Sequence, residues 1–229
     1  MSNDFLLLGH ARSGGTRVKN KMTRKFHDTT LFDLYLKKFY NITVMDNPFS
    51  KIRMALYKED EPLYSIAKES GVIITDRDES SITNNPNIDC VSLFHYLKDF
   101  DEKYVVWVNG CFPFLKEKTI IDITNYFKDN DLKSLHCVVE RQNWFWDSHK
   151  KLPINVNPFV LATQSQKTIY ESVHCLHIFD RKYMLDSNRM FPYEMNNPYL
   201  YELEDTFEFL DIDTMKDFEI CEALYARRS

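Results

Sequence analysis

The amino-acid sequence predicts an α/β fold, in which a mixed, mainly parallel central sheet is flanked by helices. Short apolar runs typical of buried strands alternate along the chain with amphipathic segments of helical period. One run, Tyr104–Val108, is apolar throughout, as expected for a central strand covered on both faces. Alternation of this kind produces strand–helix–strand units, so most strands should run in one direction. The 229 residues, 44% of them hydrophobic, suffice for one domain with a large core.

The first half of the chain contains three predicted strands and three predicted helices. Leu31, Leu34, Tyr35 and Lys38 recur at helical spacing, and Gly71 can end a helix in the left-handed conformation. The predicted strands are Phe5–Leu8, Ile52–Tyr57 and Val72–Thr75, and the predicted helices are Thr30–Phe39, Glu61–Ser70 and Asn87–Leu97.

The second half continues the alternation, with one interruption. After Tyr104–Val108 we expect a helix at Thr119–Lys128, strands at Leu135–Val139 and Ser172–Phe179, and a terminal helix at Met215–Arg227. The stretch Arg141–Gln166 carries tryptophans and prolines without a clean period. We therefore predict a single domain over residues 1–229, with an insertion or dimerisation arm at 141–170.

Composition excludes several classes of protein. A net charge of −5 argues against a broad nucleic-acid-binding surface. The five cysteines form no CxxC pair, which argues against a zinc site or a disulfide framework, and the seven histidines do not recur at metal-ligand spacing. No basic leader and no apolar stretch of about 18 residues is present. We expect a cytoplasmic protein that binds neither nucleic acid nor membrane.

A basic, glycine-containing loop directly follows the first predicted strand, where open α/β sheets bind ligands. Gly14 and Gly15 would allow backbone N–H groups to approach an anion, and the cations Arg12, Arg17, Lys19 and Lys21 could neutralise a polyphosphate. The spacing matches neither a P-loop nor a GxGxxG fingerprint. The alternative is an ordinary solvated surface loop.

Two carboxylates, Asp211 and Asp213, precede the terminal helix. On an extended segment, residues two apart point to the same side, and paired carboxylates repel each other unless a cation lies between them. Mg²⁺ takes one or two carboxylates together with phosphate oxygens. The alternative is that Asp213 or Thr214 caps the helix, and both can hold, with Asp211 on the metal and Thr214 as the cap.

A third polar position follows the central strand. Asn109 begins the segment Asn109–Phe114 at the expected carboxyl edge of the sheet, where its amide could contact a base or a sugar. A plain turn before the next helix explains the same residues.

These blocks together resemble the acylneuraminate cytidylyltransferases, the family of CMP-sialic acid and CMP-Kdo synthetases. The segment Ala11–Lys21 is similar to the family signature A-R-G-G-S-K-R-I-P-N-K, with Arg12, Gly14, Arg17 and Lys21 at matching positions. The segment Val108–Phe114 looks like the family's L-Q-P-T-S-P-L, and residues 211–218 match D-I-D-T-x-x-D-F. Nearly the whole chain is covered by the resemblance.

The resemblance implies a Rossmann-like nucleotidyltransferase fold and transfer of CMP from CTP to an acidic sugar, with release of pyrophosphate and Mg²⁺ as cofactor. It also implies a homodimer. The implied catalytic residues are Arg12, Lys21 and Asp211, the implied metal ligands are Asp211 and Asp213, and the implied nucleotide-binding residues are Ala11, Arg12, Ser13, Gly14, Gly15, Arg17, Lys21 and Asn109.

Departures from the family pattern concern the base and sugar ends. Lys19 stands at the family proline, Asn109 at its glutamine, and Cys111-Phe112 at its Thr-Ser pair. The family's sugar-framing strand is poorly matched by Ser172–Ile178. The acceptor therefore stays open between a sialic acid-like or Kdo-like sugar and a non-sugar compound such as a phosphonate, and a non-catalytic nucleotide-binding homologue is a further alternative.

Overall fold

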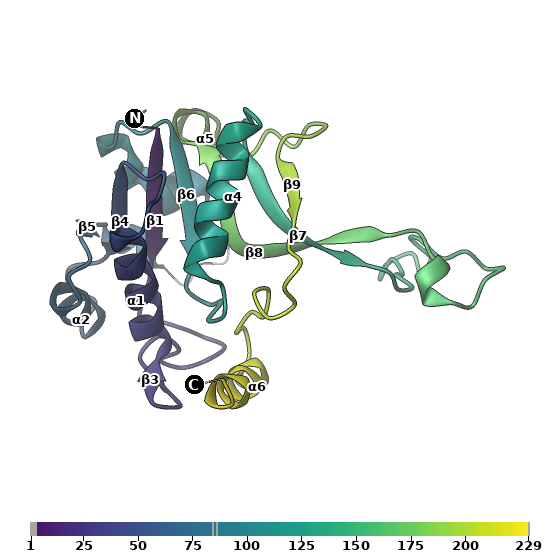
Figure 1. The fold of residues 1–229 in the computed structure, drawn as a ribbon, viewed down its shortest axis with the longest axis horizontal. Helices are drawn as coiled ribbons and strands as arrows, with labels where there is room; N and C mark the ends of the chain where they lie inside the picture. Colours follow the sequence, from purple (N-terminus) through teal and green to yellow (C-terminus); the bar gives the residue numbers. More distant parts are fainter. Residues whose placement is uncertain (1–3, 84, 86, 229) are drawn as a thin grey trace.

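The computed structural model describes residues 4–83, 85 and 87–228, which build a seven-stranded sheet with helices on both faces (Figure 1). The strand order is β5-β4-β1-β6-β8-β7-β9, and a separate two-stranded sheet pairs β2 with β3. The strands are β1 Phe5–His10, β2 Lys25–Phe26, β3 Thr29–Thr30, β4 Lys51–Leu56, β5 Ile74–Asp76, β6 Tyr104–Asn109, β7 Leu135–Arg141, β8 Ile169–Asp180 and β9 Tyr199–Glu202.

Strand direction in the large sheet is mixed but mainly parallel, as the sequence predicts. β1 pairs in parallel with β4 and β6, β4 with β5, and β7 with β9. Only β8 runs against its neighbours β6 and β7. The carboxyl ends of β1, β4, β5 and β6 therefore meet at one edge of the sheet.

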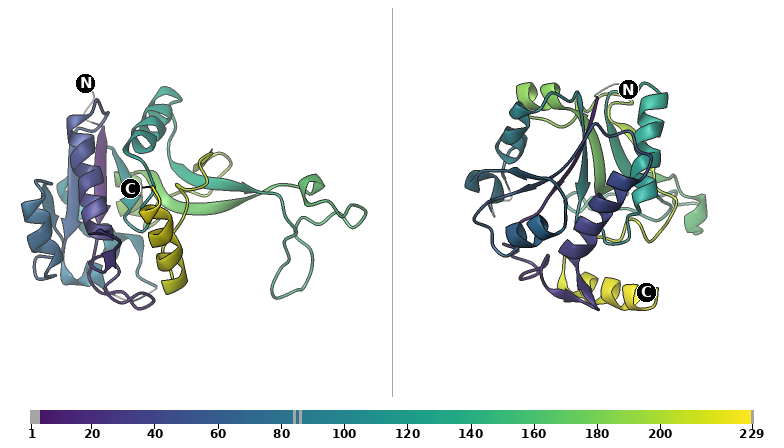
Figure 2. Two further views of the ribbon diagram at one scale, coloured as in Figure 1. Left: turned by 60° about the horizontal axis from the view of Figure 1, so that its bottom comes forward. Right: turned by 60° about the vertical axis from the view of Figure 1, so that its left-hand side comes forward.

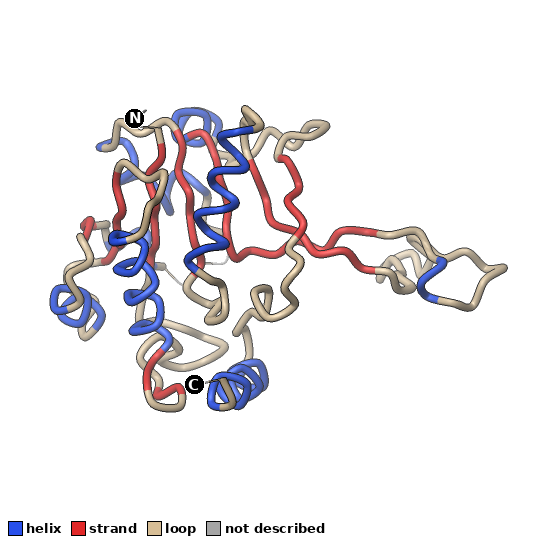
Figure 3. Tube along the Cα trace, viewed as in Figure 1, coloured by secondary structure: helices blue, strands red, loops and turns tan. Residues whose placement is uncertain are grey.

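Helices cover the two faces of the sheet in separate groups (Figures 2 and 3). Side chains of α1 and α4 pack against one face, together with Leu7, Val106 and Val108 of the central strands. The other face, which carries Leu6 and Leu8, packs against α3 and α5. The α-helices are α1 Leu31–Val44, α2 Leu63–Glu69, α3 Cys90–Phe94, α4 Glu117–Asp129, α5 Arg181–Ser187 and α6 Met215–Ala226, and the 3-10 helices are Glu79–Ile82, His95–Asp99 and Thr163–Ser165.

Most predicted elements coincide with observed ones, and the differences have physical reasons. The helix predicted at Asn87–Leu97 is divided into α3 and the 3-10 helix His95–Asp99. The third strand begins at Ile74, later than predicted, because the chain needs the left-handed Gly71 and the two following residues to turn from α2 into the sheet. β9 was missed, because it is a short edge strand whose alternating residues are only partly buried.

β7 and β8 extend beyond the sheet as a two-stranded ribbon, and the residues between them project far from the body (Figure 1). Buried amides organise this arm internally: Asn155 donates to the carbonyl oxygens of Asn143 and Lys167 at 2.8 and 2.7 Å. Large apolar side chains nevertheless stay exposed, with Phe159 93% and Leu161 84% accessible. The arm corresponds to the stretch whose sequence breaks the strand–helix rhythm.

None of the helices in the described part of the chain combines the length and the apolar character needed to cross a lipid bilayer.

Candidate functional site

The basic loop leaves the carboxyl end of β1 and is fastened to the rest of the molecule at two points. The Ser13 backbone N–H donates to the carboxylate of the buried Asp60 at 2.9 Å. The Arg12 guanidinium donates to the carbonyl oxygens of Ile82 and Thr83 at 3.0 and 2.7 Å. These hydrogen bonds fix the start of the loop beside the edge of the sheet, so its backbone has a defined position.

Glycine at position 15 is required by the turn inside this loop. A Cβ at Gly15 would lie 2.7 Å from the carbonyl oxygen of Val18, closer than a carbon atom can approach backbone oxygen. Val18 is itself buried and fixes the turn to the core. The glycine therefore allows the tight turn of the loop backbone that precedes Arg17 and Lys21.

Acidic residues from the far end of the chain lie against this loop. The Ile212 N–H donates to the carbonyl oxygen of Cys111 at 3.1 Å, and Lys21 Nζ donates to the carbonyl oxygen of Ile212 at 2.6 Å. Arg17 Nη2 lies 2.7 Å from Asp213 Oδ1. The side chain of Ile212 is fully buried, which anchors the segment between its two carboxylates.

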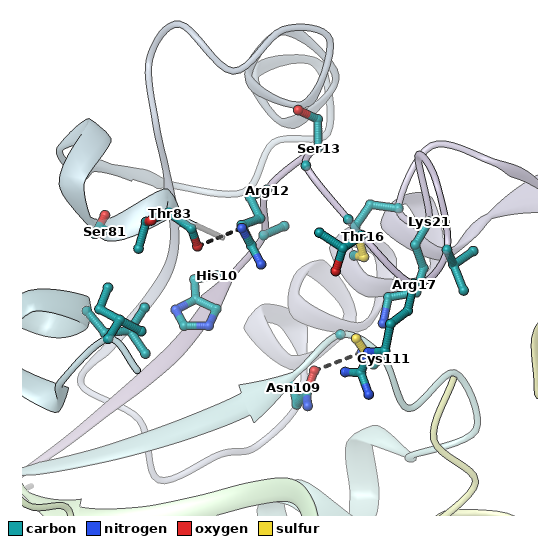
Figure 4. Close-up of a pocket in the computed structure, with 18 of the residues that line it drawn as sticks. His10, Arg12, Ser13, Thr16, Arg17, Lys21, Ser81, Thr83, Asn109 and Cys111 are labelled. Carbon is teal, nitrogen blue, oxygen red and sulfur yellow. Dashed lines mark hydrogen bonds between the residues drawn. The ribbon is translucent and has the colours of Figure 1, made fainter. Parts of the chain in front are cut away.

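The loop and the two carboxylates line one cavity of about 400 Å³. Figure 4 shows its side with Arg12, Arg17 and Lys21. The site residues implied by the family resemblance all line this cavity: Ala11, Arg12, Ser13, Gly14, Gly15, Arg17, Lys21, Asn109, Asp211 and Asp213. Lys19, the fourth cation predicted in the loop, is exposed and does not line it. Cations and glycine backbone form one wall and carboxylates form another. Residues separated by about 200 positions in the sequence thus share one cleft at the carboxyl edge of the parallel strands.

Asp211 has the properties of a cation ligand. Its Oδ1 atom is buried and finds no hydrogen-bond partner among the described residues. Burial, together with the neighbouring Asp213 carboxylate, raises the pKa of Asp211 to about 6, although Lys21 and Arg17 oppose this shift. A partly buried carboxylate without a partner is costly unless a cation compensates it. The two oxygen-donating side chains therefore fit a hard divalent ion such as Mg²⁺.

Helix capping is performed by Thr214 and not by Asp213. Thr214 forms a capping box with Asp217: its side chain accepts from the Asp217 N–H, and the Asp217 carboxylate accepts from the Thr214 N–H. Asp213 contributes only its backbone N–H, which donates to Asp217 at 3.2 Å. The capping alternative for Asp213 is therefore wrong, and both carboxylates are left to face the cavity.

Replacing Thr214 by Ala should lower the free energy of unfolding by about 1 kcal/mol, because the Asp217 N–H of helix α6 loses its acceptor. For a protein of this size the melting temperature should fall by roughly 2–4 °C. Chemical denaturation measures the change, and Lys216→Ala, an exposed substitution in the same turn, is the control. An unchanged midpoint in Thr214→Ala would contradict the role of the capping box.

Asn109 supports the turn after β6 and also lines the cavity. Its Oδ1 accepts from the Cys111 N–H at 3.0 Å, which leaves the amide NH₂ as the group available to a ligand. Burial raises the pKa of the Cys111 thiol, so at neutral pH the sulfur is protonated and a poor nucleophile.

Sequence analysis missed several residues of the cavity. His10, at the end of β1, stacks on Phe94, and burial with the nearby Arg77 and Arg12 lowers its pKa well below the usual value. Arg77 is buried beneath the loop and donates to the carbonyl oxygen of Ala11 at 3.3 Å. Ser81, Thr83 and Asn85 complete this side of the cavity. Their stretch is polar and aperiodic in sequence, so no local pattern indicates that it packs against the loop.

A glycine loop with cations lies opposite paired carboxylates at the carboxyl ends of parallel strands, the edge at which open α/β sheets bind ligands. Residues 8–225 match the family described as Cytidylyltransferase. The chain therefore belongs to the cytidylyltransferase family, whose members transfer a cytidylyl group from CTP. No curated protein matches the sequence.

Solved structures share the fold at low sequence identity. A CMP:2-keto-3-deoxy-manno-octonic acid synthetase complexed with CTP is 12% identical with a TM-score of 0.70, over 99% of this chain and 100% of that chain. A 4-diphosphocytidyl-2C-methyl-D-erythritol synthase from Anaerococcus prevotii is 14% identical with a TM-score of 0.65, over 98% and 99% of the two chains. A cytidylyltransferase from Leptospira borgpetersenii is 17% identical with a TM-score of 0.58, over 98% and 86%.

Proposed function

We propose that this protein transfers CMP from CTP to a small acidic acceptor and releases pyrophosphate. The single observation that carries the proposal is the cavity in which the loop cations face Asp211 and Asp213. Membership of the cytidylyltransferase family supports the donor, and a structure of similar fold is complexed with CTP.

The loop would bind the triphosphate in this reaction. Backbone N–H groups of Gly14 and Gly15 can approach phosphate oxygens closely, because no Cβ lies in the way. Arg12, Arg17 and Lys21 supply charge, and the guanidinium groups suit bidentate contact with phosphate. Ala11 and Ser13 would line the binding site beside these groups, with the Ser13 N–H held by Asp60, and the amide of Asn109 would contact the base or ribose.

Asp211 and Asp213 would hold Mg²⁺ together with phosphate oxygens and water. The ion, when bound, would screen the phosphate charges and stabilise the charge that develops during transfer. Asp211 fits this role because its buried oxygen has no partner among the described residues. Asp213 can share its charge with Arg17, which links the metal end of the cavity to the loop.

Chemistry would proceed by in-line displacement. An oxygen of the acceptor, either a sugar hydroxyl or a phosphonate oxygen, forms a bond to the α-phosphorus as the bond to the bridging oxygen of the β-phosphate breaks. A sugar hydroxyl loses its proton to solvent. Lys21 and Arg12 hold the departing pyrophosphate and neutralise its growing charge. Most of the rate enhancement would come from positioning and charge, as both reacting groups are held in one cleft.

The acceptor would be an acidic sugar of the sialic acid or Kdo type, or a non-sugar compound such as a phosphonate.

The protein would act as a homodimer, in which the arm at 141–170 of each subunit contacts its partner. Exposed apolar side chains on the arm, including Phe159 and Leu161, support a protein contact there. Analytical ultracentrifugation tests the dimer: a chain that sediments as a monomer at micromolar concentration would remove this part of the proposal.

Pyrophosphate release from CTP, assayed with Mg²⁺ across a panel of acidic sugars and phosphonates, tests the proposed reaction. We expect release with one class of acceptor and with CTP in preference to ATP, GTP and UTP. Binding of CTP without release for any acceptor would favour a non-catalytic homologue. Failure to bind CTP at all would overturn the assignment of the cavity.

A further inference from the structure

A second cavity, of about 700 Å³, lies on the face of the sheet that carries His177, away from the loop and carboxylate walls of the first. Three histidines line it: His136 on β7 and His174 and His177 on β8. Each can offer one ring nitrogen so that the three atoms lie within 4.8 Å of one another. No other trio of potential ligands at comparable spacing occurs among the described residues.

A β-bulge brings these rings together. In a regular strand His174 and His177, three positions apart, would point to opposite faces of the sheet. The pairing of β7 with β8 shifts between His136 and Cys137: His136 pairs with His177, whereas Cys137 pairs with Val173. Residues 174–176 of β8 therefore have no pairing partner in β7. This irregularity directs His174 to the face of the sheet that carries His177. Bulges that re-aim a side chain in this way are frequent at functional sites.

Polar atoms in the second cavity lack the partners that burial demands. His177 is 2% exposed, and its Nε2 atom has no hydrogen-bond partner among the described residues. The Nε1 atom of Trp107, which stacks on His177, is in the same condition. His136 Nδ1 and His177 Nδ1, by contrast, lie 2.9 Å apart and are hydrogen-bond partners, which leaves His177 Nε2 and Trp107 Nε1 as the unsatisfied atoms. Such groups are normally satisfied by a ligand or an ion.

We propose that His136, His174 and His177 bind a divalent transition-metal ion of the zinc type. Imidazole nitrogen is a preferred ligand for zinc, at about 2.0–2.1 Å, and three protein ligands with an open fourth position are typical of reactive zinc sites. Nitrogens within 4.8 Å of one another need only small side-chain rotations to reach that geometry. The open position would face the cavity and accept water or an anionic group.

Protonation and location are consistent with this site. Burial lowers the pKa of His136 to about 4 and lowers the pKa of His177 well below its usual value, and the histidine neighbours act in the same direction, so both rings are neutral at pH 7 and keep a lone pair for a metal. A site that binds an anion through charged imidazolium groups would need the pKa of these histidines to be raised. Trp107 contacts both His177 and His10, with ring centroids 5.1 and 5.0 Å apart. One tryptophan thus separates this site from the first cavity.

Metal binding can be measured without any assay of turnover. Protein stripped with EDTA and then supplied with excess Mg²⁺ should take up one equivalent of Zn²⁺ by calorimetry. Co²⁺ should give the visible absorption of a tetrahedral nitrogen site, reversed by added Zn²⁺. Mg²⁺ should not compete, because it prefers oxygen ligands. Absence of stoichiometric Zn²⁺ uptake by the wild-type protein would overturn the proposal.

Variants assign the ligands. His174→Ala, at an exposed side chain, should lower the Zn²⁺ affinity at least tenfold and abolish the tetrahedral cobalt spectrum. His149→Ala, an exposed histidine on the arm, is the matched control and should bind as the wild type does. Asp211→Asn should retain Zn²⁺ binding, which separates this site from the carboxylate site and from the success or failure of the proposed reaction. Equal affinity in His174→Ala and wild type would refute the assignment.

Discussion

Replacing Asp211 by Asn should reduce kcat/KM for CTP by roughly 10²–10³-fold, in the range observed when one preorganised group that stabilises transition-state charge is removed. Asn has nearly the same shape as Asp, so the fold should be unaffected while the negative charge offered to a cation is lost. Pyrophosphate release measured over a range of Mg²⁺ concentrations checks the result. Asp205→Asn, a carboxylate paired with Lys116 outside the cavity, is the control and should retain activity.

The same substitution should stabilise the metal-free protein. Because the pKa of Asp211 is raised from 3.8 to about 6, the folded state binds a proton that the unfolded state releases between these values. The stability contributed by this group is fully present below pH 4 and is lost as the pH rises through 6. Asn carries no such charge, so at pH 7.5 in EDTA the variant should be more stable by about 1 kcal/mol, after discounting for partial exposure.

Thermal melts at pH 4 and pH 7.5 test this linkage. The higher melting temperature of Asp211→Asn should be absent at pH 4. At pH 7.5 the difference in melting temperature between variant and wild type should become smaller when Mg²⁺ is added, since a ligand of the folded state stabilises the wild type. A variant that is less stable than the wild type at pH 7.5 in EDTA would show that the buried carboxylate is already compensated. A fully active variant would remove Asp211 from the metal site.

Replacing Lys21 by Met should lower kcat/KM for CTP by a similar factor, about 10²–10³-fold. Lys21 Nζ bonds to the Ile212 carbonyl oxygen at 2.6 Å and also lowers the pKa of Asp211. Met preserves the apolar stem but removes the charge that would hold the triphosphate and the leaving pyrophosphate. Steady-state kinetics with varied CTP would show the loss.

Lys19→Met is the matched control for Lys21→Met. Lys19 is an exposed cation on the same loop, two residues away, and it does not line the cavity. We expect Lys19→Met to retain most of the activity, so a loss in Lys21→Met cannot come from the net charge of the loop. Equal losses in the two variants would mean that long-range attraction of CTP, and not contact by Lys21, explains the effect.

The cationic loop and the carboxylates of the first cavity could be predicted from the sequence, because each lies in one contiguous segment. The loop around Gly14 and Gly15 and the pair Asp211 and Asp213 each carry their own local pattern. Periodicity alone could not bring them together, since about 200 residues separate the two. The similarity of their order to a family pattern supplied that link, and the shared cavity agrees with it.

Other features had no signal in the sequence. Arg77 reaches the cavity through packing beneath the loop, and its neighbours form a 3-10 helix that follows no hydrophobic period. His174 and His177 lie three positions apart, so a regular strand would direct them to opposite faces, and the irregular pairing of β7 with β8 changes this. Bulges depend on pairing between strands, so the residues of one strand alone do not determine them.

The main-chain hydrogen bonds at Ile212 determine which substitutions this position can tolerate. Both of its bonds to the cleft, from its N–H to the Cys111 carbonyl oxygen and from Lys21 to its own carbonyl oxygen, use main-chain atoms of residue 212. Every amino acid supplies these atoms, and only proline lacks the N–H. Substitution of Ile212 should therefore preserve the contact between the two ends of the chain, as long as the new side chain is apolar and fills the same space.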